Sequence, residues 1–503
     1  MPHPAAVIGI DVGTTNVKGI LLGEEGATLG FAQEEYPTYY PHRGWAEQEP
    51  DDWWQAVCSV TRRLMAEYGA RRRIAAIGIS SQAPSYVPVD REGRPVGRAI
   101  IWMDRRSDAQ VARLREQIGE ARISALCGNR IDAFYTLPKL LWHQANMPDS
   151  FRQAHKVLQV NGYVNYRLTG AFTIDAAHAG LTLMCDMQTH EWDAGLLERC
   201  GIDPALLPGV SGCMDVIGRV TPEAAACTGL PPGVPVIAGT VDGAAAALES
   251  GVVSPGIGCE MNGTSSVLIV CPDRPSATSE LIRMNHAMPG RTLLLGAMSS
   301  TGASLRWLRD QYAAAGPVDY GWMNAEAERG KAYNDLLFLP YMMGERSPVW
   351  DSHARGVFTG LSLNTSRGDM IRAVMEGCAF ALRDNVEHAE RAGAAIRSMR
   401  LVGGASQSAL WNQIKADILG KPLHIYAGTG GAPLADAALA GTAVGLFRDA
   451  AEVTGQAMKL THTVTPNGER ASFYDGKYAL YKQLYPLLQT TFAGMTNLME
   501  GLA

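Results

Sequence analysis

Two segments, far apart in the chain, share a strand, a tight turn and a second strand. The first is GIDVGTTNVKGILL at 9–22, and the second is CEMNGTSSVLIV at 259–270. In each segment apolar runs flank a turn of small residues, which is the pattern of a hairpin. An internal repeat of this kind predicts two similar domains that face each other across a cleft. The alternative is a chance similarity between two turns rich in Gly, Thr and Ser.

Strand and helix patterns alternate around both segments. In the first half we expect strands at 7–12, 17–22, 28–34 and 74–80, a hairpin from 86–89 and 98–102, and helices at 51–68, 107–119, 136–145 and 162–168. In the second half we expect strands at 236–238, 400–402 and 423–426, a strand pair within 259–270, and helices at 242–249, 302–312, 367–392, 408–419 and 433–447. This alternation predicts layers of an α/β fold.

The composition excludes several classes of protein. With 503 residues, the chain is long enough for two or three domains. Hydrophobic residues make up 47% of it and charged residues 19%, unlike a disordered chain. The 44 Lys and Arg against 50 Asp and Glu give a net charge of −6 without a basic block. A nucleic-acid partner is therefore not expected.

The sequence also bears on location. No run approaches the roughly 18 apolar residues of a membrane span, and the N-terminal stretch MPHPAAVIGIDVGTT lacks the cationic region of a secretory signal. The 9 cysteines are scattered without a CxxC pair, which argues against a disulfide framework or a zinc site. We expect a soluble, cytoplasmic protein with no membrane partner.

The turn after the first strand has the composition of a phosphate site. In Asp11-Val12-Gly13-Thr14-Thr15 the glycine permits a turn that points backbone N–H groups to one side, and the Thr hydroxyls add donors. Asp11 ends the strand and can hold Mg²⁺ through water, since Mg²⁺ keeps several waters and takes one or two carboxylates. An ordinary hairpin turn is the alternative for this segment alone.

Eight segments, taken in order, resemble the FGGY carbohydrate kinases. They are IGIDVGTTNVKGILL (8–22), GWAEQEPDDWW (44–54), AIIWMDRRS (99–107), VIAGTVDGAAAAL (236–248), NGTSSV (262–267), LPYMMGERSP (339–348), RGVFTGLSLNTSRGDMIRAVMEG (355–377) and LVGGASQSALWNQIKADILG (401–420). The resemblance runs nearly end to end, and the WAEQxP, IWMDRR and GERSP segments are most similar to the xylulokinase-like members.

This resemblance implies an α/β fold of two actin/hexokinase-like (ribonuclease H-like) domains facing each other across an active-site cleft. Residues 1–248 would form the N-terminal FGGY domain, with a phosphate hairpin, the sugar site and a catalytic Asp. Residues 249–503 would form the C-terminal FGGY domain, with the second phosphate hairpin and the adenosine site. Closure about a hinge would exclude water from the transfer.

The resemblance also implies ATP as the phosphoryl donor and a set of nucleotide contacts. These are Gly13, Thr14, Thr15, Asn16, Lys18, Gly263, Thr264, Ser265, Gly302, Arg306, Gly403, Gly404, Ala405, Ser408 and Asn412. Arg306 departs from the polar amide of glycerol kinases. Asp11 is implied as the carboxylate associated with Mg²⁺.

Asp242 matches the catalytic base of the family. A sugar hydroxyl that attacks the γ-phosphoryl group needs a carboxylate to orient it and accept its proton. Asp242 stands between an expected strand and an alanine-rich helix, where a side chain can point into a cleft. From position alone, the alternative is a helix N-cap.

The residues expected to contact the sugar depart from the xylulokinase pattern. Substrate contacts are implied for Gln82, Ala83, Pro84, Asp104, Asp242 and Gly243, with Trp45, Tyr86 and Asn161 as further candidates. Xylulokinases carry Gln-Met-His-Gly where this chain has Gln82-Ala83-Pro84-Ser85, so the imidazole contact is absent. This difference predicts that D-xylulose itself is used poorly.

We therefore expect ATP-dependent phosphorylation of a small sugar, a pentulose such as xylulose or a close relative, by direct transfer of the γ-phosphoryl group to a sugar hydroxyl. Alternatives are an FGGY kinase for an aldonate, tetritol or glycerol-like polyol, a non-catalytic sugar sensor, or a chaperone-type ATPase of the same fold. A sensor would be expected to lose Asp242 or the phosphate turns, and a chaperone would lack GWAEQEP and IWMD, yet all are present. The family also suggests a homodimer.

Overall fold

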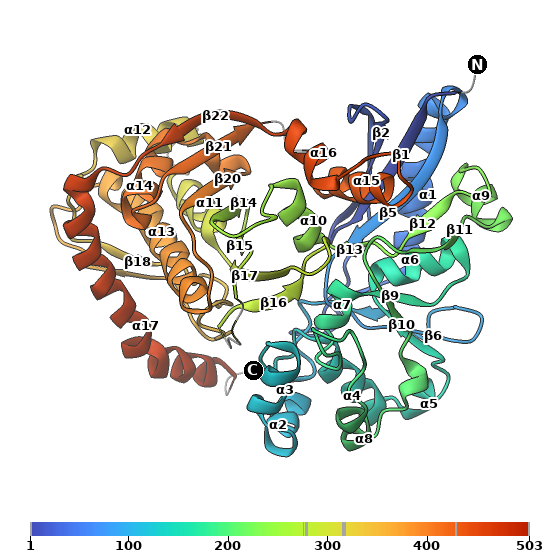
Figure 1. Cartoon of the computed structure of the whole chain (residues 1–503). Helices are drawn as coiled ribbons and strands as arrows, with labels where there is room; N and C mark the ends of the chain where they lie inside the picture. The colour runs from blue at the N-terminus through green and yellow to red at the C-terminus, as the bar shows by residue number, and fades with distance from the viewer. Residues whose placement is uncertain (1–2, 275, 277–279, 314–317, 428–429, 501–503) are drawn as a thin grey trace.

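Two seven-stranded sheets form the framework of the protein. The computed structural model describes residues 3–274, 276, 280–313, 318–427 and 430–500. The first sheet uses strands from the first half of the chain and the second sheet uses strands from the second half, with helices packed around both (Figure 1).

The first sheet has the order β11-β12-β5-β1-β2-β3, and β13 pairs with β5 beside this path. Its strands are β1 (Ala5–Val12), β2 (Asn16–Gly23), β3 (Thr28–Glu35), β5 (Arg73–Ser81), β11 (Val216–Arg219), β12 (Pro235–Ile237) and β13 (Thr240–Val241). The first three form an antiparallel meander, and β5 runs parallel to β1. Every residue of β1 is buried, as expected for an apolar strand covered on both faces.

The second sheet has the order β16-β17-β15-β14-β20-β21-β22. Its strands are β14 (Ile257–Asn262), β15 (Ser266–Val270), β16 (Ile282–Asn285), β17 (Thr292–Met298), β20 (Ser398–Val402), β21 (Leu423–Ala427) and β22 (Lys459–Val464). Here too an antiparallel run, β14-β15-β17, is followed by strands parallel to its first member, β20 and then β21.

The internal repeat predicted from the two turns is therefore confirmed by topology. Each sheet begins with a hairpin that closes on a glycine turn. The N–H of Gly13 donates to the carbonyl of Asn16 at 3.0 Å, and the N–H of Gly263 donates to the carbonyl of Ser265 at 2.9 Å. The two turns thus occupy corresponding places in the two halves.

Helices and short strands complete the two halves. The helices are α1 (Pro50–Tyr68), α2 (Asp108–Gln117), α3 (Glu120–Cys127), α4 (Thr136–Asn146), α5 (Pro148–Phe151), α6 (Val160–Thr169), α7 (Ala176–Gly180), α8 (Ala194–Cys200), α9 (Pro222–Thr228), α10 (Asp242–Glu249), α11 (Thr301–Tyr312), α12 (Tyr320–Arg329), α13 (Arg367–Arg391), α14 (Ala409–Leu419), α15 (Ala432–Ala443), α16 (Ala450–Ala457) and α17 (Ala471–Glu500). The short strands are β4 (Glu47–Gln48), β6 (Val87–Val89), β7 (Ala99–Ile100), β8 (Lys156–Leu158), β9 (Thr173–Asp175), β10 (Gly209–Ser211), β18 (Leu337–Leu339) and β19 (Val357–Thr359).

The structure departs from the expected elements at several places. The two segments expected to form a hairpin, 86–89 and 98–102, belong to different strand pairs, since β6 pairs with β8 and β7 with β4, and an isolated bridge joins Tyr86 to Ile100. The helix expected at 433–447 ends at Ala443, because the N–H groups of Leu446 and Phe447 turn back to the carbonyl of Gly441. The patterns considered above do not predict α17, which has 30 residues and an internal Pro486. This helix is held by buried tyrosines that pack into the core of the second half.

Helix α15 comes from the second half of the chain but packs on the first sheet, against β1 and β5. Glycines in both strands allow this contact. A Cβ added to Gly9 would lie 1.9 Å from the carbonyl oxygen of Pro433, and one added to Gly78 would lie 2.3 Å from that of Asp436. The helix backbone therefore rests directly on the sheet, a close approach that only glycine permits.

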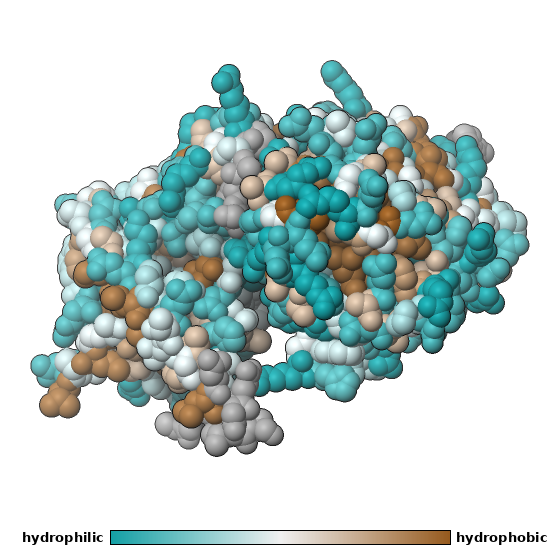
Figure 2. All heavy atoms as spheres, turned by 90° about the horizontal axis from the view of Figure 1, so that it is seen from below, coloured by the Kyte–Doolittle hydropathy of each residue, from teal (hydrophilic) through white to brown (hydrophobic). Residues whose placement is uncertain are grey.

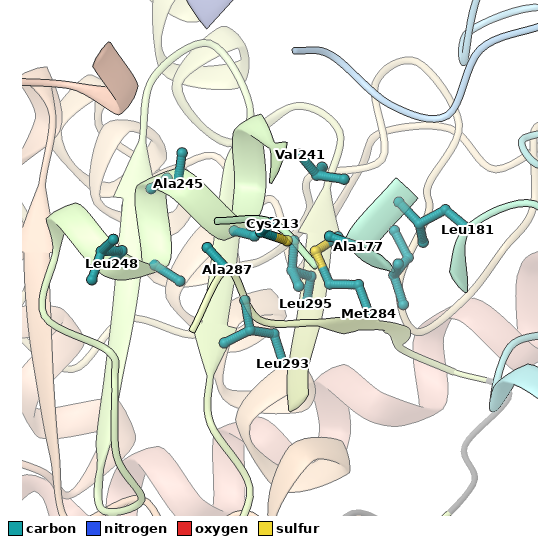
Figure 3. Packing of buried hydrophobic residues seen from close by; sticks show 14 of the residues in the cluster. Ala177, Leu181, Cys213, Val241, Ala245, Leu248, Met284, Ala287, Leu293 and Leu295 are labelled. Carbon is teal, nitrogen blue, oxygen red and sulfur yellow. The ribbon is translucent and has the colours of Figure 1, made fainter. Parts of the chain in front are cut away.

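A second apolar contact joins the two halves on the side of α10. Figure 3 shows Val241, Ala245 and Leu248 in one cluster with Met284 of β16 and Leu295 of β17. A Cβ on Gly243 would lie only 3.0 Å from the side chain of Leu295. The start of α10 is thus fixed against strands of the opposite half.

The surface seen in Figure 2 is largely hydrophilic, with apolar residues in separate small patches. Helix α17 contributes several exposed apolar side chains, namely Leu480, Leu487, Met495 and Leu498. Among the helices in the described ranges, none combines the length and the hydrophobicity needed to cross a bilayer.

Gly9→Ala should destabilise the protein, because the new methyl group meets the backbone of α15. Overpacking of this kind costs about 1–3 kcal/mol and lowers the midpoint of urea unfolding. Gly476→Ala is the matched control, since Gly476 is exposed in α17 and an added Cβ would project into open space. That control should be neutral or stabilise by up to about 1 kcal/mol. Equal midpoints for the two variants would contradict the close packing of α15.

Candidate functional site

Three neighbouring strands of the first sheet end together, and candidate residues follow each of them. The parallel register pairs Val12 of β1 and Val241 of β13 with the same residue of β5, Ser81. The next residues along the three strands are Gly13, Gln82 and Asp242. Because ligands of open α/β sheets bind at the carboxyl ends of parallel strands, this edge is the natural place for a site.

Asp242 is the first residue of α10, and its carboxylate is not used to cap the helix. Oδ1 accepts a hydrogen bond from the adjacent N–H of Gly243 at 2.6 Å, while the N-cap residue is Val241. Burial raises the pKa of Asp242 to about 6, against the opposing effects of the Gly243 N–H and the nearby His178. The group therefore titrates near neutral pH, in the range that suits proton transfer.

Asp11 and Asp436 add two further carboxyl groups at the same edge. Ser80 Oγ lies 2.7 Å from Asp436 Oδ2 and 3.3 Å from Asp11 Oδ1. Burial, followed by the charge of Asp242, raises the pKa of Asp11 to about 7. Burial also raises the pKa of Asp436 well above its usual range. The three side chains thus form a buried acidic group whose charges disfavour one another.

His178 is a structural neighbour of this group. Its Nδ1 lies 2.6 Å from Asp175 Oδ2, and its Nε2 lies 3.2 Å from Ser81 Oγ. The ring is fully buried and both nitrogens have partners. His178 therefore supports the strand ends and lies close enough for its charge to affect Asp242.

Three side chains donate hydrogen bonds to the first turn. Trp102 Nε1 donates to Thr14 Oγ1 at 3.1 Å, Gln48 Nε2 donates to the Thr14 carbonyl at 2.7 Å, and the Tyr36 hydroxyl donates to the Gly13 carbonyl. Thr15 is exposed at the tip. Lys18 pairs with Asp11 across the hairpin, where its charge partly offsets the raised pKa of that carboxyl group.

The second turn opens into a cavity of about 530 Å³ in the second half. Seven of the residues assigned from the sequence to a nucleotide line it, namely Gly263, Thr264, Gly302, Arg306, Gly404, Ala405 and Ser408. Tyr320, Asn324 and Trp411 also line it and were not singled out from the sequence. The cavity therefore brings together four separate segments of the chain.

Two glycines shape this cavity by close backbone contact. A Cβ on Gly302 would lie 2.0 Å from the carbonyl oxygen of Gly263, and one on Gly403 would lie 2.2 Å from that of Asn262. Gly403 also has a φ of 102°, which favours glycine. Asn412 lies beneath the cavity, where its Nδ2 donates to the Ser406 carbonyl at 2.7 Å.

A second cavity, of about 470 Å³, lies between the halves and shares Thr264 with the first. Its wall includes Trp102 and Phe134 from the first half and Ser265 and Arg346 from the second. Trp102 also bonds to Thr14. This cavity is therefore bordered by the second turn and by a tryptophan attached to the first.

Several side chains that the sequence assigns to the sugar site already make hydrogen bonds or ion pairs with other protein groups. Gln82 Nε2 donates to Gln48 Oε1 at 2.6 Å, while Gln82 Oε1 is buried without a hydrogen-bond partner among the described residues. Asp104 is fully buried, accepts from the Ala46 N–H at 2.6 Å and forms an ion pair with Arg106 at 2.7 Å. The peptide bond between Ala83 and Pro84 is cis.

The further candidates are also engaged with the protein. The Tyr86 hydroxyl lies 2.7 Å from His143 Nδ1, and Asn161 Nδ2 donates to Asp175 at 2.8 Å. Trp45 stacks on Arg106, whose guanidinium carbon lies 3.6 Å from the ring centre.

Sequence reasoning missed Asp436 and gave no role to Arg346. The signal for Asp436 was a single carboxylate in an otherwise small and apolar helix, APLADAALAGTA. The signal for Arg346 was its place within the GERSP segment, which contributed to the resemblance without a role for any of its residues.

Comparisons with known proteins agree with this geometry. Residues 6–249 match the N-terminal domain and residues 261–444 the C-terminal domain of the FGGY family of carbohydrate kinases. The chain is similar to the xylulose kinase of Escherichia coli, with 32% identity over 96% of this chain and 99% of the relative. It is 30% identical to a glycerol kinase of Gloeobacter violaceus over 95% of this chain and 96% of the relative. Its fold is similar to the crystal structure of xylulose kinase from Rhodospirillum rubrum, with a TM-score of 0.91, 31% identity and coverage of 97% and 100%.

Glu345, on the wall of the second cavity, should make stability depend on pH. Burial raises its pKa from 4.5 to about 7, so the folded protein holds this proton more tightly than the unfolded chain does. The contribution of this proton to the free energy of unfolding is therefore lost as the pH rises from 4.5 through 7. The loss between pH 6 and pH 8 is about 1 kcal/mol.

Glu345→Gln should remove this part of the pH dependence, because the amide keeps an oxygen for the N–H groups of Ser299 and Arg346. Urea unfolding of the wild type and the variant at both pH values measures the difference. Parallel pH profiles for the two proteins would show that Glu345 does not titrate in this way.

Proposed function

The chain belongs to the FGGY family of carbohydrate kinases, and from this premise we propose which of its residues carry the phosphoryl transfer and which sugar accepts it. As a member of that family it is a phosphotransferase that uses ATP to phosphorylate a small sugar. The proposal assigns the donor to the first cavity, the acceptor to the second, and the general base to Asp242.

The donor site follows from the lining of the first cavity. We place the adenosine among Gly404, Ala405 and Ser408, with Arg306 at the exposed wall. The phosphates then extend toward Thr264, the residue that both cavities share. Backbone N–H groups at glycine turns suit phosphate oxygens, so Gly263 to Ser265 bind from one side and Gly13 to Asn16, with Lys18 behind them, from the other.

Asp242 is proposed as the base because its carboxylate stands at the strand edge and, among the described residues, is bonded only to the adjacent N–H of Gly243. Its pKa of about 6 leaves it ionised at neutral pH, ready to accept the proton of a sugar hydroxyl. Transfer of that proton strengthens the hydroxyl oxygen as a nucleophile toward the γ-phosphorus. The observation that carries the proposal is the shared register of β1, β5 and β13, which aligns the first turn, Gln82 and Asp242.

The same edge fits Mg²⁺. Burial raises the pKa values of Asp11 and Asp242, and the charge of Asp242 raises that of Asp11 further. Mg²⁺ usually keeps several waters and takes only one or two carboxylates. We propose that Asp11 holds it through water; when bound, Mg²⁺ supplies positive charge beside the phosphate oxygens.

The acceptor is proposed to be a pentulose or a close relative. Several similar relatives are named xylulose kinases, and the second cavity offers aromatic faces from Trp102 and Phe134 beside polar groups. Such surfaces suit the alternating apolar and hydroxyl faces of a sugar.

Asp242→Asn should lower kcat about 10²–10⁴-fold, because the amide cannot accept the proton. Binding of ATP, measured by calorimetry, should remain. Asp193→Asn is a matched control: Asp193 caps another short helix, α8, by accepting from the Leu196 N–H at 2.7 Å, and this variant should keep kcat. Turnover by Asp242→Asn within a few-fold of the wild type would remove Asp242 from the reaction.

D-xylulose is expected to be a poor acceptor among the pentuloses. The segment at Ala83-Pro84 carries no imidazole, and the amide nitrogen of Gln82 already binds Gln48. A site that lacks one hydrogen-bond partner for a hydroxyl discriminates against the sugar that needs it. Release of ADP with pentuloses, pentitols, tetritols and aldonates ranks kcat/KM for each. A tenfold advantage for D-xylulose would show that this segment carries no specificity.

A further inference from the structure

The backbone around Arg346 is fixed by groups other than its own side chain. Glu345 Oε1 accepts from the N–H of Ser299 at 2.7 Å and from the N–H of Arg346 at 2.8 Å. The next residue, Ser347, donates its N–H to the Ala297 carbonyl at 3.0 Å, and its hydroxyl accepts from the Ala297 N–H at 3.0 Å. The GERSP segment is therefore attached to the end of β17, and Arg346 projects from a fixed point.

The guanidinium of Arg346 has no acidic or carbonyl partner within the described residues. Its carbon lies 5.3 Å from the centre of the Trp102 ring, and the group lines the second cavity. Burial lowers the pKa of Arg346, which Glu345 partly opposes. The donors of this half-buried guanidinium therefore face the cavity, where water or the oxygens of a ligand can accept from them.

The neighbouring arginines differ from it in this respect. Arg105, on the same cavity wall, forms an ion pair with Asp132 at 2.5 Å. Arg106 is paired with Asp104 at 2.7 Å and with Glu47 at 2.8 Å. Within this part of the described structure, Arg346 is thus the cationic cavity residue whose donors remain available.

Trp102 fixes where such a ligand would lie. Its indole nitrogen binds Thr14 in the first phosphate turn, while its ring faces Arg346. A molecule whose reacting hydroxyl is near the turns and whose chain lies along Trp102 therefore reaches Arg346 with its other end. A guanidinium offers only donors, in a planar fork. The atoms it binds must be hydroxyl, carbonyl or carboxylate oxygens.

We propose that Arg346 binds oxygens at the end of the acceptor remote from the phosphorylated hydroxyl, and so selects pentuloses over the shorter glycerol. This inference rests on the proposed function, since it takes the second cavity as the acceptor site. Glycerol is two carbons shorter than a pentulose, so we expect it to offer no oxygen at this end of the cavity. Loss of a hydrogen bond to a charged group changes binding by roughly 10–150-fold.

The test compares wild type, Arg346→Gln and Arg346→Lys with the best pentulose and with glycerol. Arg346→Gln should raise KM for the pentulose roughly 10–150-fold, leave KM for ATP unchanged, and leave kcat/KM for glycerol unchanged. The KM of Arg346→Lys for the pentulose should lie between those of the wild type and Arg346→Gln, because lysine keeps the charge but lacks the planar fork of donors. Arg355→Gln is the control and should leave both KM values unchanged: Arg355 lies nine residues further along the chain, is exposed, and donates to the carbonyls of Ser352 and Ala354.

Each other result overturns the proposal. An unchanged KM for the pentulose would make Arg346 structural, and a raised KM for ATP alone would assign it to the phosphates. An equal loss for glycerol and the pentulose would remove its role in selection. If Arg346→Gln unfolds at a lower temperature than the wild type, Arg346→Lys is used instead, and the ratio of kcat/KM for the pentulose to kcat/KM for glycerol decides. Failure of the wild type to phosphorylate any sugar would instead refute the proposed function, so the two failures are distinct.

Discussion

Helix α15 belongs by sequence to the second half of the chain, but its backbone rests on the first sheet. The contact depends on Gly9 and Gly78, where any Cβ would enter the space of the helix carbonyls. Asp436 on the same helix also bonds to Ser80 at 2.7 Å. On the opposite side, α10 of the first half packs against β16 and β17 of the second (Figure 3). The two sheets are therefore joined by exchanged helices, and the edges that carry the turns are held face to face.

This arrangement also sets the electrostatics of the site. Asp11, Asp242 and Asp436 are brought together from three distant segments, and burial raises the pKa of each. Destabilising the charged form is what moves Asp242 into the range of an effective base. In the proposed mechanism, a cation and the turn N–H groups complement the phosphate charge that arrives with the donor.

Much of this could be predicted from the sequence because its signals are local. Glycine and hydroxyl residues between two apolar runs identify the phosphate turns, and the alanine-rich segment after Asp242 indicates α10. Long-range contacts could not be predicted. Asp436 binds a serine 356 residues away, and the carboxylate of Asp104 is held by Arg106 and the Ala46 N–H. The role proposed for Arg346 rests on its lack of an acidic partner among the described residues. No sequence pattern indicates such a lack.

The central claim is that both turns and Asp242 act on one phosphoryl group in a single transfer from ATP to the sugar. The stereochemistry at phosphorus tests it directly, using ATP made chiral at the γ-phosphorus with oxygen isotopes. A single in-line displacement inverts the configuration in the sugar phosphate, and the account predicts inversion. Retention would require a phosphorylated enzyme intermediate and would contradict the assignment of Asp242 as a base that acts on the sugar hydroxyl.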